Sequence, residues 1–306
     1  MRISKYAAID IGSNAVRLLV SNVIERKNKP TLFTKNTMVR VPIRLGQDTF
    51  THGSIGMPNQ QRMIDAMLSF KKLMGVHGVS HYMACATSAL REAKNGSELV
   101  ERILKETEVA VEIIDGKREA EIIAMTDLYD VMKPHKSYLL VDVGGGSTEL
   151  TVIDRGKTIA SKSFKIGTVR LLNKMVTDKE MASYQKWIEK HTHKLERLSV
   201  VGSGGTINKV FKLSGVRIGK PLSYILLSEY YEYLKQLTHK ELIVDLRLNQ
   251  DRADVIVPAV HIYLLAMKQS GANKIYVPKI GLADGMVKRM YQDPSQGYDL
   301  NTLFED

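Results

Sequence analysis

The chain has very little cysteine and no long apolar run. Cys85 is the only cysteine among 306 residues, so no disulfide can form within the chain. The longest apolar stretch, residues 255–267, contains Pro258 and His261 and is too short to cross a bilayer. Residues 1–5 lack the apolar core of a secretory leader. These absences predict a soluble protein of a reducing compartment, most simply the cytoplasm, without a membrane partner.

Acidic residues are scarce relative to basic ones. Lys and Arg number 44 against 33 Asp and Glu, which gives a formal net charge of +11 at pH 7. A field of that sign attracts polyanionic ligands, although a basic surface also serves solubility. The sequence has no helix-turn-helix, zinc-finger or RNA-binding signature, and its basic clusters are short. The charge therefore favours a phosphate polymer over a specific nucleic acid.

Two glycine-rich loops each follow an aspartate at the end of an apolar run. The first is the segment 10–14, Asp-Ile-Gly-Ser-Asn, and the second is the segment 142–149, Asp-Val-Gly-Gly-Gly-Ser-Thr-Glu. Backbone N–H groups and hydroxyls in such loops can converge on phosphate oxygens, and an Asp beside them can hold a hydrated divalent cation. Each loop joins two strand-like runs. The duplication predicts two similar half-molecules that face one cleft.

A third loop, Gly-Ser-Gly-Gly-Thr at 202–206, follows the apolar run 198–200 and precedes a helical pattern. This order is typical of a helix N-terminus that receives an anion. A Walker-type Gly-Lys-Ser or Gly-Lys-Thr loop and a serine-nucleophile elbow are absent. The loops therefore favour phosphate binding without the machinery of a P-loop protein or an acyl hydrolase.

The length and the periodicity predict two α/β domains. A chain of 306 residues exceeds the size at which a single core usually stops growing. We expect an N-terminal domain at 1–121, which the extreme C-terminal tail rejoins unless it frays, and a C-terminal domain at 122–306. The expected strands are 5–10, 16–24, 31–45, 81–86, 109–114, 137–143, 150–153 and 157–164. The expected helices begin at Pro58 and near Glu121 and cover 97–105, 177–196, 228–238 and 252–270.

In this order, the three loop motifs resemble those of the exopolyphosphatase and guanosine pentaphosphate phosphatase family. The segments 86–95 and 252–258 match as well, so the resemblance runs from about residue 6 to about residue 290. It implies an α/β fold of two actin-like, ribonuclease H-like domains with an interdomain cleft, as in the sugar kinase, actin and heat-shock chaperone superfamily. The chain is similar to a short, two-domain form of this family, whose longer members carry a further helical domain.

The loops and the resemblance together name the expected site residues. Asp10 and Asp142 are candidate ligands of Mg²⁺ or Mn²⁺ beside the scissile phosphoryl group, and Glu149 could hold the metal or position water. Arg91 is a candidate cationic contact to the reacting phosphate, since guanidinium geometry suits phosphate. The residues expected to bind phosphate are Gly12, Ser13, Asn14, Arg17, Gly144, Gly145, Gly146, Ser147, Thr148, Gly204, Gly205 and Thr206. Arg170 flanks these loops and could contact the rest of a chain-like polyanion, although a single charge of this kind is more often on the surface.

Glu119 stands directly before an alanine, where the family carries the carboxylate that activates water. The resemblance therefore implies that Glu119 is the general base. Acidic residues are also common in first helical turns, and Glu121 is a rival base. The chain departs from the family pattern at Arg118, where an acidic residue is usual, and at Ala283 with the following aspartate, where the family has Arg-Glu.

The resemblance implies Mg²⁺-dependent hydrolysis of the terminal phosphoanhydride bonds of inorganic polyphosphate, with release of orthophosphate. Conversion of guanosine pentaphosphate to tetraphosphate is the alternative with the same chemistry. A superfamily kinase would need an acceptor site and an adenine pocket behind the third loop. A non-catalytic sensor of polyphosphate or of the guanosine alarmone is the alternative from another class. A homodimer is left open.

Overall fold

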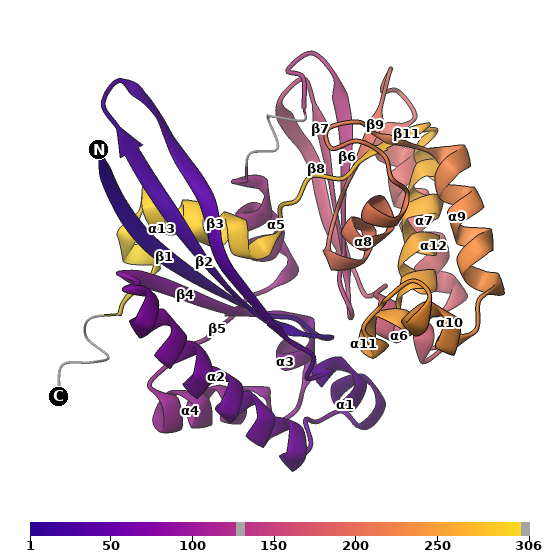
Figure 1. Cartoon of the computed structure of the whole chain (residues 1–306). Coiled ribbons are helices and arrows are strands. Elements are labelled where there is room, and N and C mark those ends of the chain that lie inside the picture. Colours follow the sequence, from indigo (N-terminus) through magenta and orange to yellow (C-terminus); the bar gives the residue numbers. More distant parts are fainter. Residues whose placement is uncertain (127–131, 301–306) are drawn as a thin grey trace. The chain divides into compact units, whose positions relative to one another are not determined.

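The computed structural model describes residues 1–126 and 132–300 (Figure 1). Within these ranges, residues 1–126 and 281–300 form one compact unit, and residues 132–280 form a second. The expected ranges, 1–121 and 122–306, differ from these units, chiefly because the segment from residue 281 onward packs with the N-terminal part. Which segments fold as independent domains stays a prediction. The final tail residues, 301–306, lie outside the described residues.

The first unit is built on a mixed sheet with the strand order β3-β2-β1-β4, and β5 and β12 both pair with β4. β1, β2 and β3 form an antiparallel meander, whereas β4 runs parallel to β1. The strands are β1 (Arg2–Ile11), β2 (Val16–Arg26), β3 (Lys29–Val41), β4 (His81–Ala86), β5 (Glu112–Ile113) and β12 (Tyr298–Asp299).

Both faces of this first sheet are buried. Successive strand residues point to opposite faces, and β1 accordingly sends Ala7 and Ile9 into one apolar cluster and Tyr6 and Ala8 into another. Side chains of α2 and α4 contribute to the first cluster, and those of α5 and α13 to the second. The helices are α1 (Leu45–His52), α2 (Met57–His77), α3 (Ser88–Glu92), α4 (Gly96–Thr107), α5 (Gly116–Ala124) and α13 (Leu282–Gln292), with a 3₁₀ turn at Pro294–Gln296.

The second unit repeats this plan, with the strand order β10-β11-β9-β6-β7-β8. β6, β7 and β8 form the antiparallel meander, and β9 runs parallel to β6. The strands are β6 (Ser137–Val143), β7 (Thr148–Asp154), β8 (Lys157–Phe164), β9 (Ser199–Ser203), β10 (Leu222–Ser223) and β11 (Lys274–Tyr276). The helices are α6 (Thr168–Leu172), α7 (Asp178–Thr192), α8 (Gly205–Leu213), α9 (Tyr224–Gln236), α10 (His239–Val244), α11 (Gln250–Ala253) and α12 (Ile256–Ser270).

A meander whose first strand is flanked by a parallel fourth strand is the arrangement of actin-like, ribonuclease H-like units. The α/β fold class with two actin-like units is therefore confirmed. This topology places the first and second loops in the turns that follow β1 and β6, and the third loop after β9. No helix among the described residues is long and apolar enough to span a membrane.

Several elements differ from the sequence expectation for local reasons. The strand expected to reach residue 45 ends at Val41, because Arg44 takes a left-handed conformation and α1, which was not expected, begins after it. The helix expected near Glu121 begins earlier, since the Asp115 side chain accepts a hydrogen bond from the backbone N–H of Arg118 and caps the first turn. The helix expected over 252–270 is divided into α11 and α12.

Candidate functional site

The first glycine-rich loop is held by backbone hydrogen bonds from the start of α1. The carbonyl oxygens of Ser13 and Asn14 accept bonds from the N–H groups of Gly46, at 2.7 Å, and Arg44, at 3.1 Å. The Ser13 hydroxyl lies 2.9 Å from that of Ser88 and is buried. A trans peptide directs its N–H opposite to its C=O, so the next amides in the loop point away from α1. The backbone of this loop is therefore better placed than the Ser13 hydroxyl to contact a ligand.

Asp10 and Arg17 lie directly opposite each other on β1 and β2. The Nη1 atom of Arg17 donates to Oδ2 of Asp10 at 2.7 Å, and the Asp10 side chain is buried. The ion pair satisfies one carboxylate oxygen and fixes the guanidinium group beside the loop. Because Arg carries further N–H donors, Arg17 could contact an anion while remaining paired.

The second glycine-rich loop turns its carbonyl groups toward the N-terminal part of α6. The Gly144 oxygen accepts from the N–H of Thr168 at 3.0 Å, and the Gly145 oxygen accepts from that of Val169 at 2.9 Å. The Gly146 oxygen accepts from Nε of Arg170 at 2.7 Å.

The described peptide bonds are trans. The N–H groups that follow these three carbonyls, those of Gly145, Gly146 and Ser147, therefore point away from α6. Three successive amides presented in this way can bind an anion.

The β8–α6 connection leaves the second loop little freedom. A Cβ atom at Gly167 would lie 2.3 Å from the Gly145 oxygen, so only glycine allows the two segments to approach this closely. Thr148 is fully buried, and its hydroxyl donates to the Ile166 carbonyl at 2.5 Å. The Thr148 side chain thus anchors the loop in this structure.

Asp142 and Glu149 flank the second loop and are direct cross-strand partners on β6 and β7. One carboxylate oxygen of each lies within 4.8 Å of one of the other, and Glu149 is buried. Ser163 donates to Oε1 of Glu149 at 2.8 Å. Two like charges directly opposite each other destabilise an antiparallel pair, so this pair is suited to a cation or a shared proton. Oxygen donors of this kind fit a hard divalent cation such as Mg²⁺ or Mn²⁺.

The third loop is joined to Asp142 by a chain of two hydrogen bonds. The Ser203 hydroxyl donates to Oδ1 of Asp142 at 2.5 Å, and the Tyr263 hydroxyl of α12 donates to the Ser203 carbonyl. Gly204 has a φ of 116°, and a Cβ there would lie 3.1 Å from the Val143 oxygen. Burial, followed by the nearby charge of Asp142, raises the pKa of Tyr263, so its hydroxyl remains a donor. α8 begins directly after this turn at Gly205 and Thr206.

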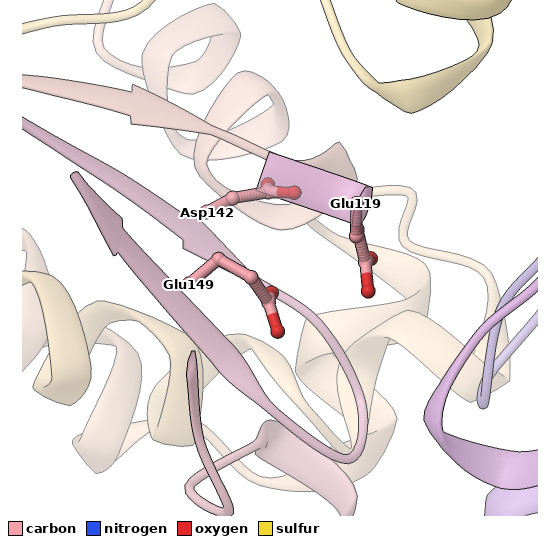
Figure 2. Close-up of side chains that lie close together, drawn as sticks. All are labelled: Glu119, Asp142 and Glu149. Carbon is pink, nitrogen blue, oxygen red and sulfur yellow. The ribbon is translucent and has the colours of Figure 1, made fainter. Parts of the chain in front are cut away.

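Glu119 lies in the first turn of α5 in the first unit and is buried. Figure 2 labels its side chain together with those of Asp142 and Glu149 from the second unit. The rival base Glu121 is exposed. Arg91, on α3, donates from Nη1 to the Ile114 carbonyl at 2.6 Å, one residue before the cap of α5. Arg91 therefore ties α3 to the start of the helix that carries Glu119.

The structure gives defined contacts to three side chains that were not among the expected site residues. Arg170 is buried against the second loop, so the expectation of a surface charge is wrong. The hydroxyls of Ser203 and Tyr263 hold Asp142 and the third loop. Gly167 is a local sign in the sequence that the segment before Arg170 lies close to another part of the chain. The contacts of the Ser203 and Tyr263 hydroxyls have no local sign, because they depend on packing between segments that are far apart in the sequence.

Together, the repeated actin-like sheets, the glycine-rich loops and the paired carboxylates define a protein class that handles phosphate groups with a divalent cation. The profile of the Ppx/GppA phosphatase family matches residues 23–293, which is most of the chain. The chain therefore belongs to the Ppx/GppA phosphatase family.

Individual relatives agree with this assignment. Exopolyphosphatase 1 of Mycobacterium bovis is 24% identical over 316 residues, which cover 96% of this chain and 90% of that protein. A bifunctional 3-dehydroquinate synthase/phosphatase of Fusobacterium nucleatum is 27% identical over 217 residues, which cover 65% of this chain. The match spans about a third of that longer protein, 32%.

Solved structures share the fold across nearly the whole chain. The crystal structure of the Aquifex aeolicus Ppx/GppA family member superposes with a TM-score of 0.75 at 26% identity, covering 96% of this chain and 99% of that one. The crystal structure of an exopolyphosphatase from Cytophaga hutchinsonii gives a TM-score of 0.82 at 24% identity, covering 94% and 98%.

Proposed function

We propose that this protein is an exopolyphosphatase that releases orthophosphate from the ends of inorganic polyphosphate with the help of Mg²⁺. The observation that carries the proposal is the Asp142–Glu149 pair on the two strands that flank a loop with three outward amides. Membership of a phosphatase family supports hydrolysis. The exopolyphosphatase that aligns with nearly the whole chain supports the substrate.

Asp142 and Glu149 are the proposed metal ligands. A divalent cation between two opposed carboxylates would offset their repulsion, and the Ser203 and Ser163 hydroxyls orient the two groups. Asp10 is a further candidate through Oδ1, since Arg17 bonds to Oδ2. When bound, Mg²⁺ would offset the charge that develops on the phosphoryl oxygens.

The glycine-rich loops are proposed to bind the phosphates. The amides of Gly145, Gly146 and Ser147 contact phosphate oxygens, and Arg17 adds a guanidinium contact from the first unit. The N-terminus of α8, at Gly205 and Thr206, offers a further anion site. These contacts need no base or sugar, which is consistent with an inorganic chain as the substrate.

Glu119 is proposed to be the general base. A water oxygen attacks the terminal phosphorus, the bridging P–O bond breaks, and the shortened chain leaves with the bridging oxygen. The water proton passes to the Glu119 carboxylate. Arg91 contributes by holding the start of α5 and by offering its remaining N–H groups to the transferred phosphoryl group.

A phosphate-release assay tests the proposal with long-chain polyphosphate, guanosine pentaphosphate and ATP at fixed Mg²⁺. We expect the highest kcat/KM with polyphosphate. A clear preference for guanosine pentaphosphate would assign the alternative phosphatase activity. Tight polyphosphate binding without turnover would make the protein a sensor.

Glu119→Gln tests the base, with Glu121→Gln as the matched control on the exposed face of the same helix. We expect the first variant to lose about 10²- to 10⁴-fold in kcat, the usual contribution of a general base, and to keep its affinity for polyphosphate. We expect the control to keep parental activity. If Glu119→Gln turns over at the parental rate, another group activates water.

A further inference from the structure

α13 crosses α5 with its backbone in direct contact, at a glycine. A Cβ atom at Gly285 would lie 2.0 Å from the carbonyl oxygen of Ile122 and 2.7 Å from its carbonyl carbon. Real Cβ atoms essentially never approach other heavy atoms closer than 3.0 Å. Gly285 therefore sets how closely the two helices approach, and the atoms it meets are backbone atoms that cannot rotate aside.

The C-terminal segment also holds both ends of α5. Gln296 accepts hydrogen bonds from Arg118 at 3.0 Å and from Arg289 at 3.1 Å, which links the first turn of α5 to α13. Nη1 of Arg289 lies 3.9 Å from the sulfur of Met125, which follows the last turn of α5. All of these contacts lie within the first unit.

Glu119 lies one turn before Ile122 on the same helix. Residues three apart lie on the same side of a helix, so a displacement of α5 at the crossing moves the Glu119 carboxylate with it. The buried side chains of Ile122 and Met286 pack in one apolar cluster and leave little room for a compensating tilt.

We infer that Gly285 is a positioning residue for the catalytic carboxylate of Glu119, which it holds through the α13–α5 crossing. The inference rests on the proposed role of Glu119 as the base. A methyl group at position 285 must push the helices apart by about 1 Å, and misplacement of that size can cost about 10²-fold in rate.

The test compares Gly285→Ala with Gly281→Ala. Gly281 caps the same helix, has an extended φ of −168°, and has no atom within 4 Å of an added Cβ. We expect Gly285→Ala to lower kcat for polyphosphate by about 10²-fold with little change in KM, and Gly281→Ala to behave as the parent. Similar losses in both variants would overturn the inference, as would a Gly285→Ala loss confined to KM.

A second experiment combines Gly285→Ala with Glu119→Gln and measures the residual kcat for polyphosphate. If Gly285 acts through the carboxylate, its substitution costs little more once that carboxylate is gone. An equal fold-loss in both backgrounds shows a general structural defect and overturns the inference.

Hydrogen exchange of residues 116–124 separates this inference from the proposed function. Faster exchange in Gly285→Ala than in Gly281→Ala supports the contact, and unchanged exchange refutes it. Full activity of Glu119→Gln alone removes the base assignment, and with it the catalytic role of Gly285, whatever the exchange rates.

Gln296→Ala weakens the attachment of α5 without adding bulk, and it replaces Gly285→Ala in the test if that variant fails to fold. It removes the acceptor that Arg118 and Arg289 share. We expect a smaller loss of kcat than with Gly285→Ala, again with KM retained. Parental kcat in this variant counts against the positioning role of the segment.

Discussion

Replacing Glu149 by Gln should stabilise the metal-free protein and remove its response to Mg²⁺. The substitution deletes one charge of the Asp142–Glu149 pair and keeps an oxygen that can accept the bond from Ser163. Most substitutions of buried residues destabilise a protein, so a gain in stability would be specific evidence for repulsion between the two carboxylates.

The size of the effect follows from the geometry of the pair. Two unit charges within 4.8 Å of each other repel by about 3 kcal/mol at an effective dielectric constant of about 20. Partial exposure of Asp142 reduces this value, and so does a proton shared by the pair. We therefore expect a gain of about 1–3 kcal/mol, and each kcal/mol raises the melting temperature of a domain of this size by about 2–4 °C.

Thermal unfolding in chelator and in Mg²⁺ measures both effects, with Glu189→Gln as the control. Glu189 is an exposed glutamate of the second unit, and its substitution removes the same charge. We expect Mg²⁺ to stabilise the parent and the control but not Glu149→Gln. A Glu149→Gln protein that is less stable than the parent in chelator and is still stabilised by Mg²⁺ would refute the reasoning.

Two further expectations concern buried groups. Arg170→Met leaves the buried Gly146 carbonyl without its donor, which costs about 1–3 kcal/mol. We expect this variant to have a lower melting temperature and a higher KM for polyphosphate, and Arg170→Lys to restore both in part. A parental KM in Arg170→Met would count against a role of this side chain in the second loop. Burial raises the pKa of Cys85 from 9.0 to about 12, so above pH 9 the thiol ionises in the unfolded chain before it ionises in the folded one. Stability is lost as the pH rises through this window, by up to about 1.4 kcal/mol per pH unit, and denaturant unfolding should show a shallower loss for Cys85→Ala than for the parent; parallel curves would contradict the shift.

The order of strands along the chain could be predicted from the sequence because its signals are local, whereas the actin-like arrangement of the sheets was predicted from the family resemblance. Apolar runs that end in Asp-x-Gly turns mark β1 and β6, and the hairpin signals that follow them give two meanders. The cross-strand pairing of Asp142 with Glu149 also depends mainly on local structure, since the residues flank one short turn. The roles of the loop residues, of Glu119 and of the metal ligands stay predictions from the family pattern.

Other features could not be read from local patterns. The sequence suggested neither α1, which begins after the left-handed residue Arg44, nor the division of the helix expected over 252–270 into α11 and α12. Arg170 was expected to be a surface charge, because a charged side chain near a loop is usually exposed. In the structure its Nε atom donates to the Gly146 carbonyl, and this hydrogen bond offsets part of the cost of burying the guanidinium group.

By itself, the sequence determined the fold class, the family and the positions of the three glycine-rich loops, because short-range periodicity and contiguous motifs carry that information. Only the tertiary structure decided that Ser203 donates to Asp142, that Tyr263 donates to the Ser203 carbonyl, and that Gly285 of α13 contacts the backbone of α5. These contacts join residues far apart in the chain. They exist because packing brings particular backbone atoms within hydrogen-bonding or van der Waals distance, and no local pattern in the sequence encodes that distance.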